Sequence, residues 1–121
     1  MTEKTIVLVV EDDPLQMIMA GDIVEDAGFE ALFANTADKA VTLLESRDDI
    51  GIVFTDVNMP RSMDGLQLAA IVHERWPPIG ILVVSGDTPR EATALPQRSH
   101  FLNKPYAPDR VIRGLKILAP A

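Results

Sequence analysis

Short apolar runs alternate with helix-patterned segments along this chain, and this alternation constrains the fold more than any other feature. Five runs have the length and apolar content of strands: residues 6–10, 29–33, 50–55, 79–84 and about 100–102. Apolar residues recur at helical spacing in the segments between and after them. This order predicts a parallel sheet with helices on both faces, joined by right-handed crossovers. We therefore expect an α/β fold of five strands and five helices in one domain, residues 1–121.

Capping residues and prolines divide the helical segments. Asp13 and Pro14 have the residue types of an N-cap and a first helical position, and Gly28 ends the first helix. The apolar positions of that helix are Leu15, Ile18, Met19 and Ile23. We expect them to form its buried stripe, with Met19 a core residue.

Two later segments carry further signals. Residues 88–91 have the pattern of a capping box, and Pro96 ends that helix after about two turns, so we expect the fourth helix to be short or poorly ordered. Trp76 precedes Pro77 and Pro78, which forbid continuation of the third helix. We expect Trp76 to pack at the helix end and leave an exposed docking role open.

Charge and composition exclude several classes of protein. The chain has 18 acidic and 11 basic residues and a net charge of −7, which provides no basic footprint for nucleic acid. It has no cysteine, so disulfides, thiolate metal sites and cysteine catalysis are excluded. No apolar run approaches the roughly 18 residues of a membrane helix. We expect a soluble cytoplasmic domain that binds neither nucleic acid nor membrane.

Chemically capable side chains follow four of the five predicted strands. Ligands of open parallel sheets bind beyond the carboxyl ends of the strands, so the residues that follow each strand would converge on one edge. In strand order these residues are Glu11, Asp12 and Asp13, then Asp56 and Asn58, then Ser85, and last Lys104.

The chemistry of such a group is specific. Clustered carboxylates repel one another unless they take up protons or find a cation, and hard oxygen ligands suit Mg²⁺. The cation, the Ser85 hydroxyl and the Lys104 ammonium could together hold a phosphoryl group. Asp56 could then act as the nucleophile and form an aspartyl phosphate, a reaction that needs mainly positioning and charge neutralisation.

Five motifs in order resemble the receiver domain of two-component response regulators. They are Val10-Glu11-Asp12-Asp13-Pro14, Thr55-Asp56-Val57-Asn58-Met59-Pro60, Met63-Asp64-Gly65, Val84-Ser85-Gly86 and Phe101-Leu102-Asn103-Lys104-Pro105. The resemblance covers nearly the whole chain. It implies a flavodoxin-like, doubly wound sheet with strand order 2-1-3-4-5. Ser85 and Lys104 are closer in sequence than in most receivers, which again implies a shortened fourth helix.

The resemblance also implies a function for each matching residue. Asp56 would accept a phosphoryl group from the phosphohistidine of a sensor histidine kinase or a histidine phosphotransfer protein. Asp12 and Asp56 would bind Mg²⁺ through their carboxylates, Asn58 through its backbone carbonyl, and Glu11 through water. Ser85 and Lys104 would contact the phosphoryl group. Phe101 would hold the place of the aromatic switch residue, and the Lys104–Pro105 bond is expected to be cis.

The hypothesis is therefore a stand-alone signalling domain that is not an enzyme in the usual sense. It would catalyse only its own phosphorylation and dephosphorylation, and would signal by protein–protein contact; a weak homodimer is left open. A degenerate receiver that binds partners without phosphorylation is one alternative. The other is an aspartate-nucleophile phosphatase, which would need a second acid at the position of Asn58.

Overall fold

The computed structural model of this chain describes residues 4–59, 63–86 and 97–120, in which five strands and four helices are found. The strands are β1 (Ile6–Val10), β2 (Glu30–Ala34), β3 (Ile50–Asp56), β4 (Gly80–Ser85) and β5 (Ser99–Asn103). The helices are α1 (Pro14–Asp26), α2 (Ala37–Ser46), α3 (Gly65–Arg75) and α4 (Pro108–Leu118).

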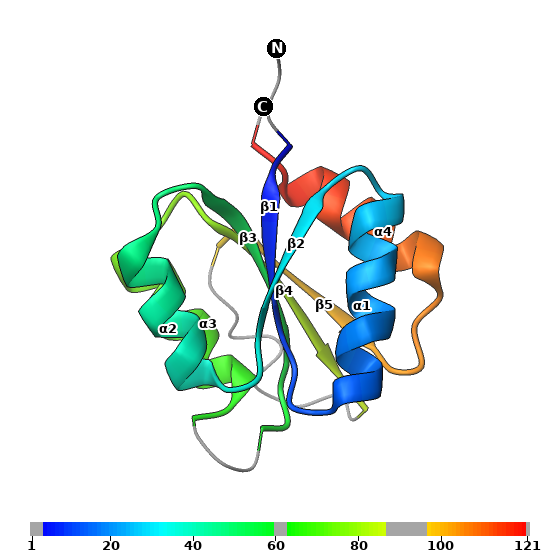
Figure 1. The fold of residues 1–121 in the computed structure, drawn as a ribbon, viewed down its shortest axis with the longest axis horizontal. Coiled ribbons are helices and arrows are strands. Elements are labelled where there is room, and N and C mark those ends of the chain that lie inside the picture. Colours follow the sequence, from blue (N-terminus) through cyan, green and yellow to red (C-terminus); the bar gives the residue numbers. More distant parts are fainter. Residues whose placement is uncertain (1–3, 60–62, 87–96, 121) are drawn as a thin grey trace.

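The five strands form one parallel sheet in the order β2-β1-β3-β4-β5. Helices α1 and α4 cover one face, and α2 and α3 cover the other (Figure 1). This confirms the predicted flavodoxin-like architecture and strand order. The helix expected at residues 88–95 lies outside the described residues.

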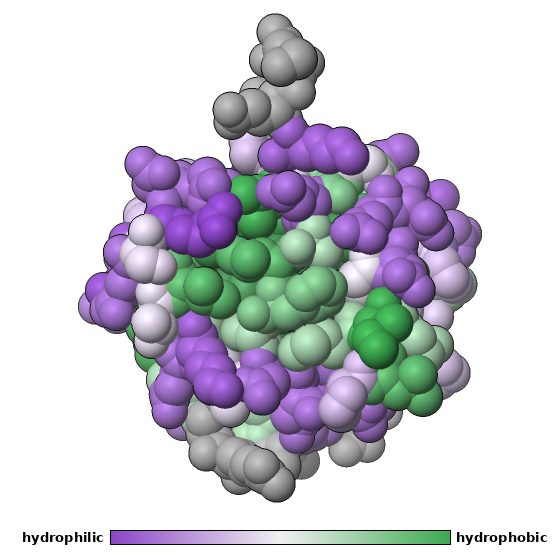
Figure 2. All heavy atoms as spheres, in the orientation of Figure 1, coloured by the Kyte–Doolittle hydropathy of each residue, from purple (hydrophilic) through white to green (hydrophobic). Residues whose placement is uncertain are grey.

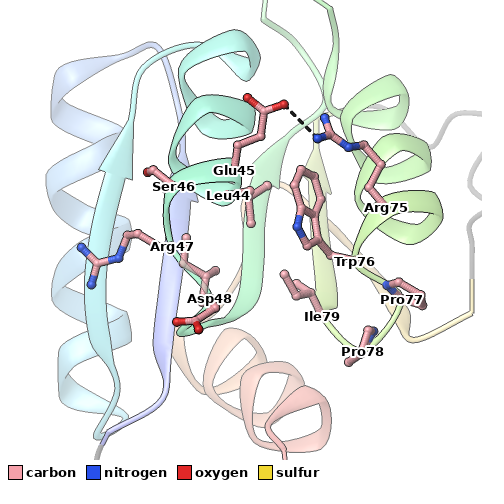
Figure 3. A pocket seen from close by; sticks show the side chains of 11 residues that line it. Leu44, Glu45, Ser46, Arg47, Asp48, Arg75, Trp76, Pro77, Pro78 and Ile79 are labelled. Carbon is pink, nitrogen blue, oxygen red and sulfur yellow. Dashed lines mark hydrogen bonds and ion pairs between the residues drawn. The ribbon is translucent and has the colours of Figure 1, made fainter.

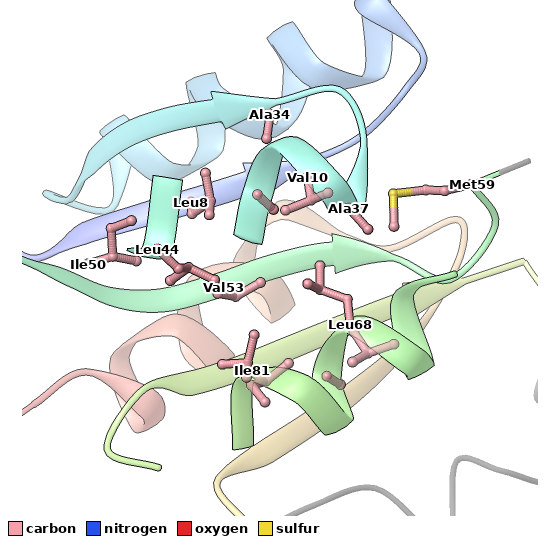
Figure 4. Close-up of a cluster of buried hydrophobic side chains, with 14 of the residues drawn as sticks. Leu8, Val10, Ala34, Ala37, Leu44, Ile50, Val53, Met59, Leu68 and Ile81 are labelled. Atoms are coloured by element: carbon pink, nitrogen blue, oxygen red, sulfur yellow. The ribbon is translucent and has the colours of Figure 1, made fainter. Parts of the chain in front are cut away.

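Two apolar cores sandwich the sheet. The first packs alternate residues of β1, β3 and β4, including Leu8, Val53 and Ile81, against α2 and α3 (Figure 4). The second packs the intervening residues, including Val9, Ile52 and Leu82, against α1 and α4. Every residue of β1 and β4 is therefore buried, which explains why these strands read as continuous apolar runs.

Helix α1 differs from the prediction in the face that it buries. Of the expected apolar stripe, Leu15, Ile18 and Met19 are 65%, 60% and 54% exposed, and only Ile23 packs, half-buried, against the core. The buried residues are instead Ala20, Gly21 and Val24. Their small size allows close packing: a Cβ built on Gly21 would lie 2.6 Å from Cζ of Phe33 on β2. The helix thus approaches the sheet through its smallest side chains and exposes its largest.

The parallel arrangement brings the carboxyl ends of all five strands to one edge of the sheet, the lower edge in Figure 1. Asp13 caps α1 there, accepting hydrogen bonds from the backbone amides of Leu15 and Gln16. Asp64 caps α3 in a capping box with Gln67. These caps fix where each helix leaves the edge that holds the candidate site.

Candidate functional site

Two buried carboxylates lie at the carboxyl ends of neighbouring strands. Asp56 is the last residue of β3 and Glu11 directly follows β1, and each is only 6% exposed. Backbone amides hold both side chains: Asn58 N donates to Asp56 Oδ1 at 3.1 Å, and Asp13 N donates to Glu11 Oε2 at 3.1 Å. Both carboxylates therefore have a fixed orientation before any ligand binds.

Lys104 joins these carboxylates from the end of β5. Its Nζ lies 2.7 Å from Asp56 Oδ2 and 3.7 Å from Glu11 Oε1. Its backbone amide donates to the Ser85 carbonyl at 2.7 Å, which fixes the start of the loop after β5. Three residues separated by up to 93 positions in the sequence thus meet in one ion-pair group.

The charges of this group are not balanced. The pKa of Glu11 is raised to about 7, chiefly by burial; the nearby charge of Asp56 and a hydrogen bond with Asp12 also raise it, and the Asp13 amide and Lys104 oppose the shift. Burial lowers the pKa of Lys104, but its hydrogen bond and charge interaction with Asp56 outweigh this and hold the pKa above its usual value. One ammonium faces two carboxylates, so this site favours an additional positive charge.

The donor chemistry suits a hard divalent cation, although the described side chains do not form a complete cage. Glu11 and Asp56 offer buried carboxylate oxygens of the kind that Mg²⁺ prefers. Asp12 and Asn58 are exposed at the rim of the site. In residues 4–59, 63–86 and 97–120, no three His, Cys, Asp or Glu side chains are grouped closely enough to hold a metal ion.

The remaining predicted site residues lie on the neighbouring strands. Ser85 ends β4 and is 2% exposed. Phe101 lies in β5 beside Val83 and packs, half-buried, against the core under α2 and α3. Its packing accounts for its burial and does not test a switching role. The Lys104–Pro105 peptide bond is cis.

Two further residues contact the site without having been predicted. Gln16, on the first turn of α1, accepts a hydrogen bond from Lys104 Nζ through its Oε1 atom at 2.7 Å. Tyr106 packs its ring 6.2 Å from that of Phe54 and lines a small cavity together with Glu11 and Asp56. Burial raises the pKa of the Tyr106 hydroxyl. No motif in the sequence indicates Gln16, because its approach to Lys104 depends on how α1 packs against the sheet.

A cavity lies at the opposite end of the sheet from this site. It measures about 660 Å³ and is lined by the carboxyl ends of α2 and α3, with Trp76 at its centre (Figure 3). The Arg75 guanidinium stacks 4.4 Å from the Trp76 ring centroid and pairs with Glu45 at 2.8 Å. Trp76 therefore packs at the helix end, as predicted, and this cavity shares no residue with the carboxylate–lysine group.

No helix in the described ranges is long and apolar enough to cross a membrane. Among the described residues, the buried acid and hydroxyl side chains are Glu11, Thr55, Asp56 and Ser85. All four lie at the carboxyl ends of β1, β3 and β4, and Lys104 reaches between Glu11 and Asp56. This arrangement is the basis for comparison with known proteins.

Comparisons with known proteins agree with this geometry. The response regulator receiver domain family matches residues 7–116. Nitrogen assimilation regulatory protein NtrX of Azorhizobium caulinodans is 31% identical over 110 residues, which are 88% of this chain and 24% of that protein. This chain spans about a quarter or less of the length of the first curated relatives it matches.

Solved structures show the same fold. A response regulator receiver protein from Sinorhizobium medicae superposes with a TM-score of 0.89 at 26% identity, covering 96% of this chain and 94% of that one. A response regulator receiver protein from Pseudomonas putida gives 0.84 at 26% identity, covering 97% and 99%. The family match over most of the chain, together with the sheet order, shows that this chain belongs to the response regulator receiver domains of two-component signalling.

Proposed function

We propose that this domain receives a phosphoryl group on Asp56 and passes the signal on by protein–protein contact. Receiver domains are signalling domains that interact with histidine kinases. The donor would be the phosphohistidine of a sensor histidine kinase or of a histidine phosphotransfer protein. The domain would occupy residues 1–121 and act in the cytoplasm. The chain contains no cysteine, which is compatible with the reducing conditions of that compartment.

The observation that carries this proposal is the 2.7 Å ion pair between Lys104 Nζ and Asp56 Oδ2. A buried carboxylate at a strand end is a common structural feature. An ammonium held against it from a strand two places away is what a phosphoryl group on that carboxylate requires, because its oxygens need a fixed positive charge. The Ser85 hydroxyl, at the end of the intervening strand β4, is the neutral donor in this proposal.

In the proposed transfer, one carboxylate oxygen of Asp56 bonds to phosphorus while the bond between phosphorus and the donor's imidazole nitrogen breaks. The other ring nitrogen of the donor carries a proton before the transfer, so the imidazole leaves with the electron pair of the broken bond as a neutral ring with one N–H. Lys104 then shifts from the free carboxylate to the phosphoryl oxygens. The amide of Asn58, which already donates to Asp56 Oδ1, keeps the carboxylate oriented during the reaction.

Magnesium is the cofactor of this proposal. Asp12 and Asp56 would bind it through their carboxylates, Asn58 through its carbonyl, and Glu11 through water. When bound, Mg²⁺ supplies positive charge to the phosphoryl oxygens and offsets the charge of Glu11 and Asp56. The two buried carboxylates of Glu11 and Asp56, which face the single ammonium of Lys104, support a cation at this position.

Phosphorylation by a small donor tests the proposal without a partner. The full chain is incubated with Mg²⁺ and acetyl phosphate or phosphoramidate, and intact mass is measured with and without base treatment. We expect one base-labile phosphoryl group per chain. Asp56→Asn should abolish it, whereas Asp48→Asn, an exposed acid at the opposite end of the sheet, should leave it unchanged.

The same experiment distinguishes the alternatives. Rapid release of many phosphates per chain, with no trapped adduct, would indicate a phosphatase; Asn58 stands where that chemistry would need a second acid. An unlabelled chain that also fails to bind Mg²⁺ in a titration would indicate a degenerate receiver. Either result would contradict the proposed function.

A further inference from the structure

Gln16 links the first helix to the lysine of the site. Its Oε1 atom accepts a hydrogen bond from Lys104 Nζ at 2.7 Å, and the same nitrogen donates to Asp56 Oδ2 at 2.7 Å. Gln16 and Lys104 lie 88 positions apart in the sequence, so the fold alone brings them together. The transfer proposed above does not account for this contact.

Hydrogen bonds fix the backbone of Gln16 relative to the acids of the site. The Gln16 amide donates to Asp13 Oδ1 at 3.2 Å, and the Asp13 amide donates to Glu11 Oε2 at 3.1 Å. Lys104 Nζ lies 3.7 Å from Glu11 Oε1 and so closes these contacts into a ring. The N-cap of α1 therefore places the Gln16 side chain beside the ammonium, in register with the loop that carries Glu11.

The side chains around Gln16 on α1 are apolar. Gln16 is the one polar residue in the run Leu15–Met19, and three of its four apolar neighbours in that run are more than half exposed. Figure 2 shows apolar atoms on the near side of α1, at the right of the view. This part of the helix thus presents a single polar side chain, and its carbonyl oxygen meets Lys104.

Without this hydrogen bond, the Lys104 ammonium would have room to leave the site. Its side chain is 22% exposed and borders a cavity of about 480 Å³. Gln16 and Ile23 of α1 line that cavity, together with Tyr106 and Pro108 beyond β5. A lysine side chain loses considerable entropy when it is ordered, so each further acceptor that meets the ammonium narrows the range of positions it visits.

We propose that Gln16 is a positioning residue for phosphoryl transfer, because it holds the Lys104 ammonium over the acceptor carboxylate of Asp56. An ammonium has three N–H donors, so Lys104 can keep its bond to Gln16 while another N–H turns from Asp56 to a phosphoryl oxygen. The positive charge that the transition state needs is then in place before the donor arrives. This inference rests on the proposed phosphorylation of Asp56.

Removal of the acceptor atom at constant side-chain length tests the proposal. Gln16→Met keeps the length of the side chain but has no carbonyl oxygen. We expect it to slow phosphoryl uptake from phosphoramidate by about three- to tenfold. Ile18→Met places the same side chain at an exposed apolar position of α1 and should keep the parent rate. Equal rates in Gln16→Met and the parent would overturn the proposal.

NMR of the lysine ammonium groups separates positioning from a general effect on the fold. In a chain with isotope-labelled lysine and no phosphoryl donor, Lys104 is compared with the exposed Lys39 and Lys116. We expect its ammonium to be more ordered than theirs in the parent and to lose order in Gln16→Met. Gln16→Glu keeps an acceptor at the same length and should retain that order. An ammonium that is equally ordered in the parent and in Gln16→Met would overturn the proposal, even if the rate of uptake fell.

The order of the Lys104 ammonium is measured without phosphorylation, so the two proposals can fail separately. A parent chain that takes up no phosphoryl group would contradict the proposed function of Asp56. A parent chain that is phosphorylated, with a Gln16→Met variant that is equally fast and equally ordered at Lys104, would contradict the role of Gln16 alone.

Discussion

At the scale of single residues, the site depends on one ammonium with three acceptors from different elements. Lys104 Nζ lies within 3.7 Å of Glu11, which follows β1, and within 2.7 Å of both Asp56 on β3 and Gln16 on α1. Only the carboxylates and the lysine could be predicted, because each follows a recognisable strand. Gln16 could not, because its position near Lys104 depends on how α1 is rotated against the sheet.

The raised pKa of Glu11 predicts how stability depends on pH in the metal-free protein. Its carboxyl has an ordinary pKa of 4.5 and a pKa of about 7 in the folded chain. Between these values the folded state holds a proton that the unfolded chain has lost, so the unfolding free energy falls as pH rises. This contribution is fully present below pH 4.5 and is lost as pH rises through about 7.

Urea unfolding with a chelator, at several pH values from 4.5 to 8, measures this effect. Glu11→Gln carries no titrating group at this position, so its unfolding free energy should lack this component. We expect the parent to lose stability relative to Glu11→Gln across the window. A difference between the two proteins that stays constant with pH would show that burial of Glu11 does not control its protonation.

At the scale of elements, the sequence pattern identified helices correctly but not always the face that each buries. In α2 the helical spacing predicts a buried face of Ala37, Ala40, Val41 and Leu44, and all of these are buried except the half-buried Val41. In α3 the spacing predicts Leu66, Ala69, Ala70 and His73, of which only Ala69 is buried, beside Leu68 and Val72. In α1 hydrophobicity pointed to the wrong face, because close packing selects small side chains over large ones. The spacing of apolar residues shows that a segment is helical, but how closely the helix packs on the sheet decides which of its faces is buried.

Gly65, the first residue of α3, connects element packing to the site. A Cβ there would overlap the carbonyl oxygen of Asp56 and lie 2.9 Å from the Val57 Cα, and its own amide donates to the Val57 carbonyl at 2.9 Å. These contacts are with backbone atoms, which cannot rotate away as a side chain can. We expect Gly65→Ala to lower the unfolding free energy by about 2–3 kcal/mol and to slow phosphoryl uptake, because α3 must move away from Asp56.

Gly21→Ala is the matched control for this prediction. Its Cβ would meet only the ring of Phe33, a half-exposed side chain that can move aside. Alanine also favours a helix interior over glycine by about 1 kcal/mol, which offsets the contact. We expect a net change within about 1 kcal/mol in chemical denaturation. Equal losses of unfolding free energy in Gly65→Ala and Gly21→Ala would contradict the prediction that a backbone contact costs more stability than a contact with a movable side chain.

At the scale of the whole molecule, the fold was predictable because strand and helix patterns alternate without interruption. The convergence of strand ends then follows from parallel pairing alone, which explains why the sequence predicts that Asp56 and Lys104 lie together. The strand order came from resemblance, since alternation does not determine which strands are neighbours.

Because the strand ends meet at one edge of the sheet, a ligand bound at that edge stabilises the whole sheet. The candidate cation ligands, Glu11, Asp12, Asp56 and Asn58, come from the ends of two central strands that must separate when the chain unfolds. A cation that binds only the folded state adds about 1.4 kcal/mol to the unfolding free energy when its concentration is ten times its dissociation constant.

We expect Mg²⁺ to raise the midpoint temperature of thermal unfolding and a chelator to reverse this rise. The substitution Asp12→Asn should strongly reduce the rise that Mg²⁺ causes. Asp48→Asn, at the far end of the sheet, should keep the full shift. If NaCl at equal ionic strength raised the midpoint equally, the effect would be screening of the −7 net charge rather than binding at this site.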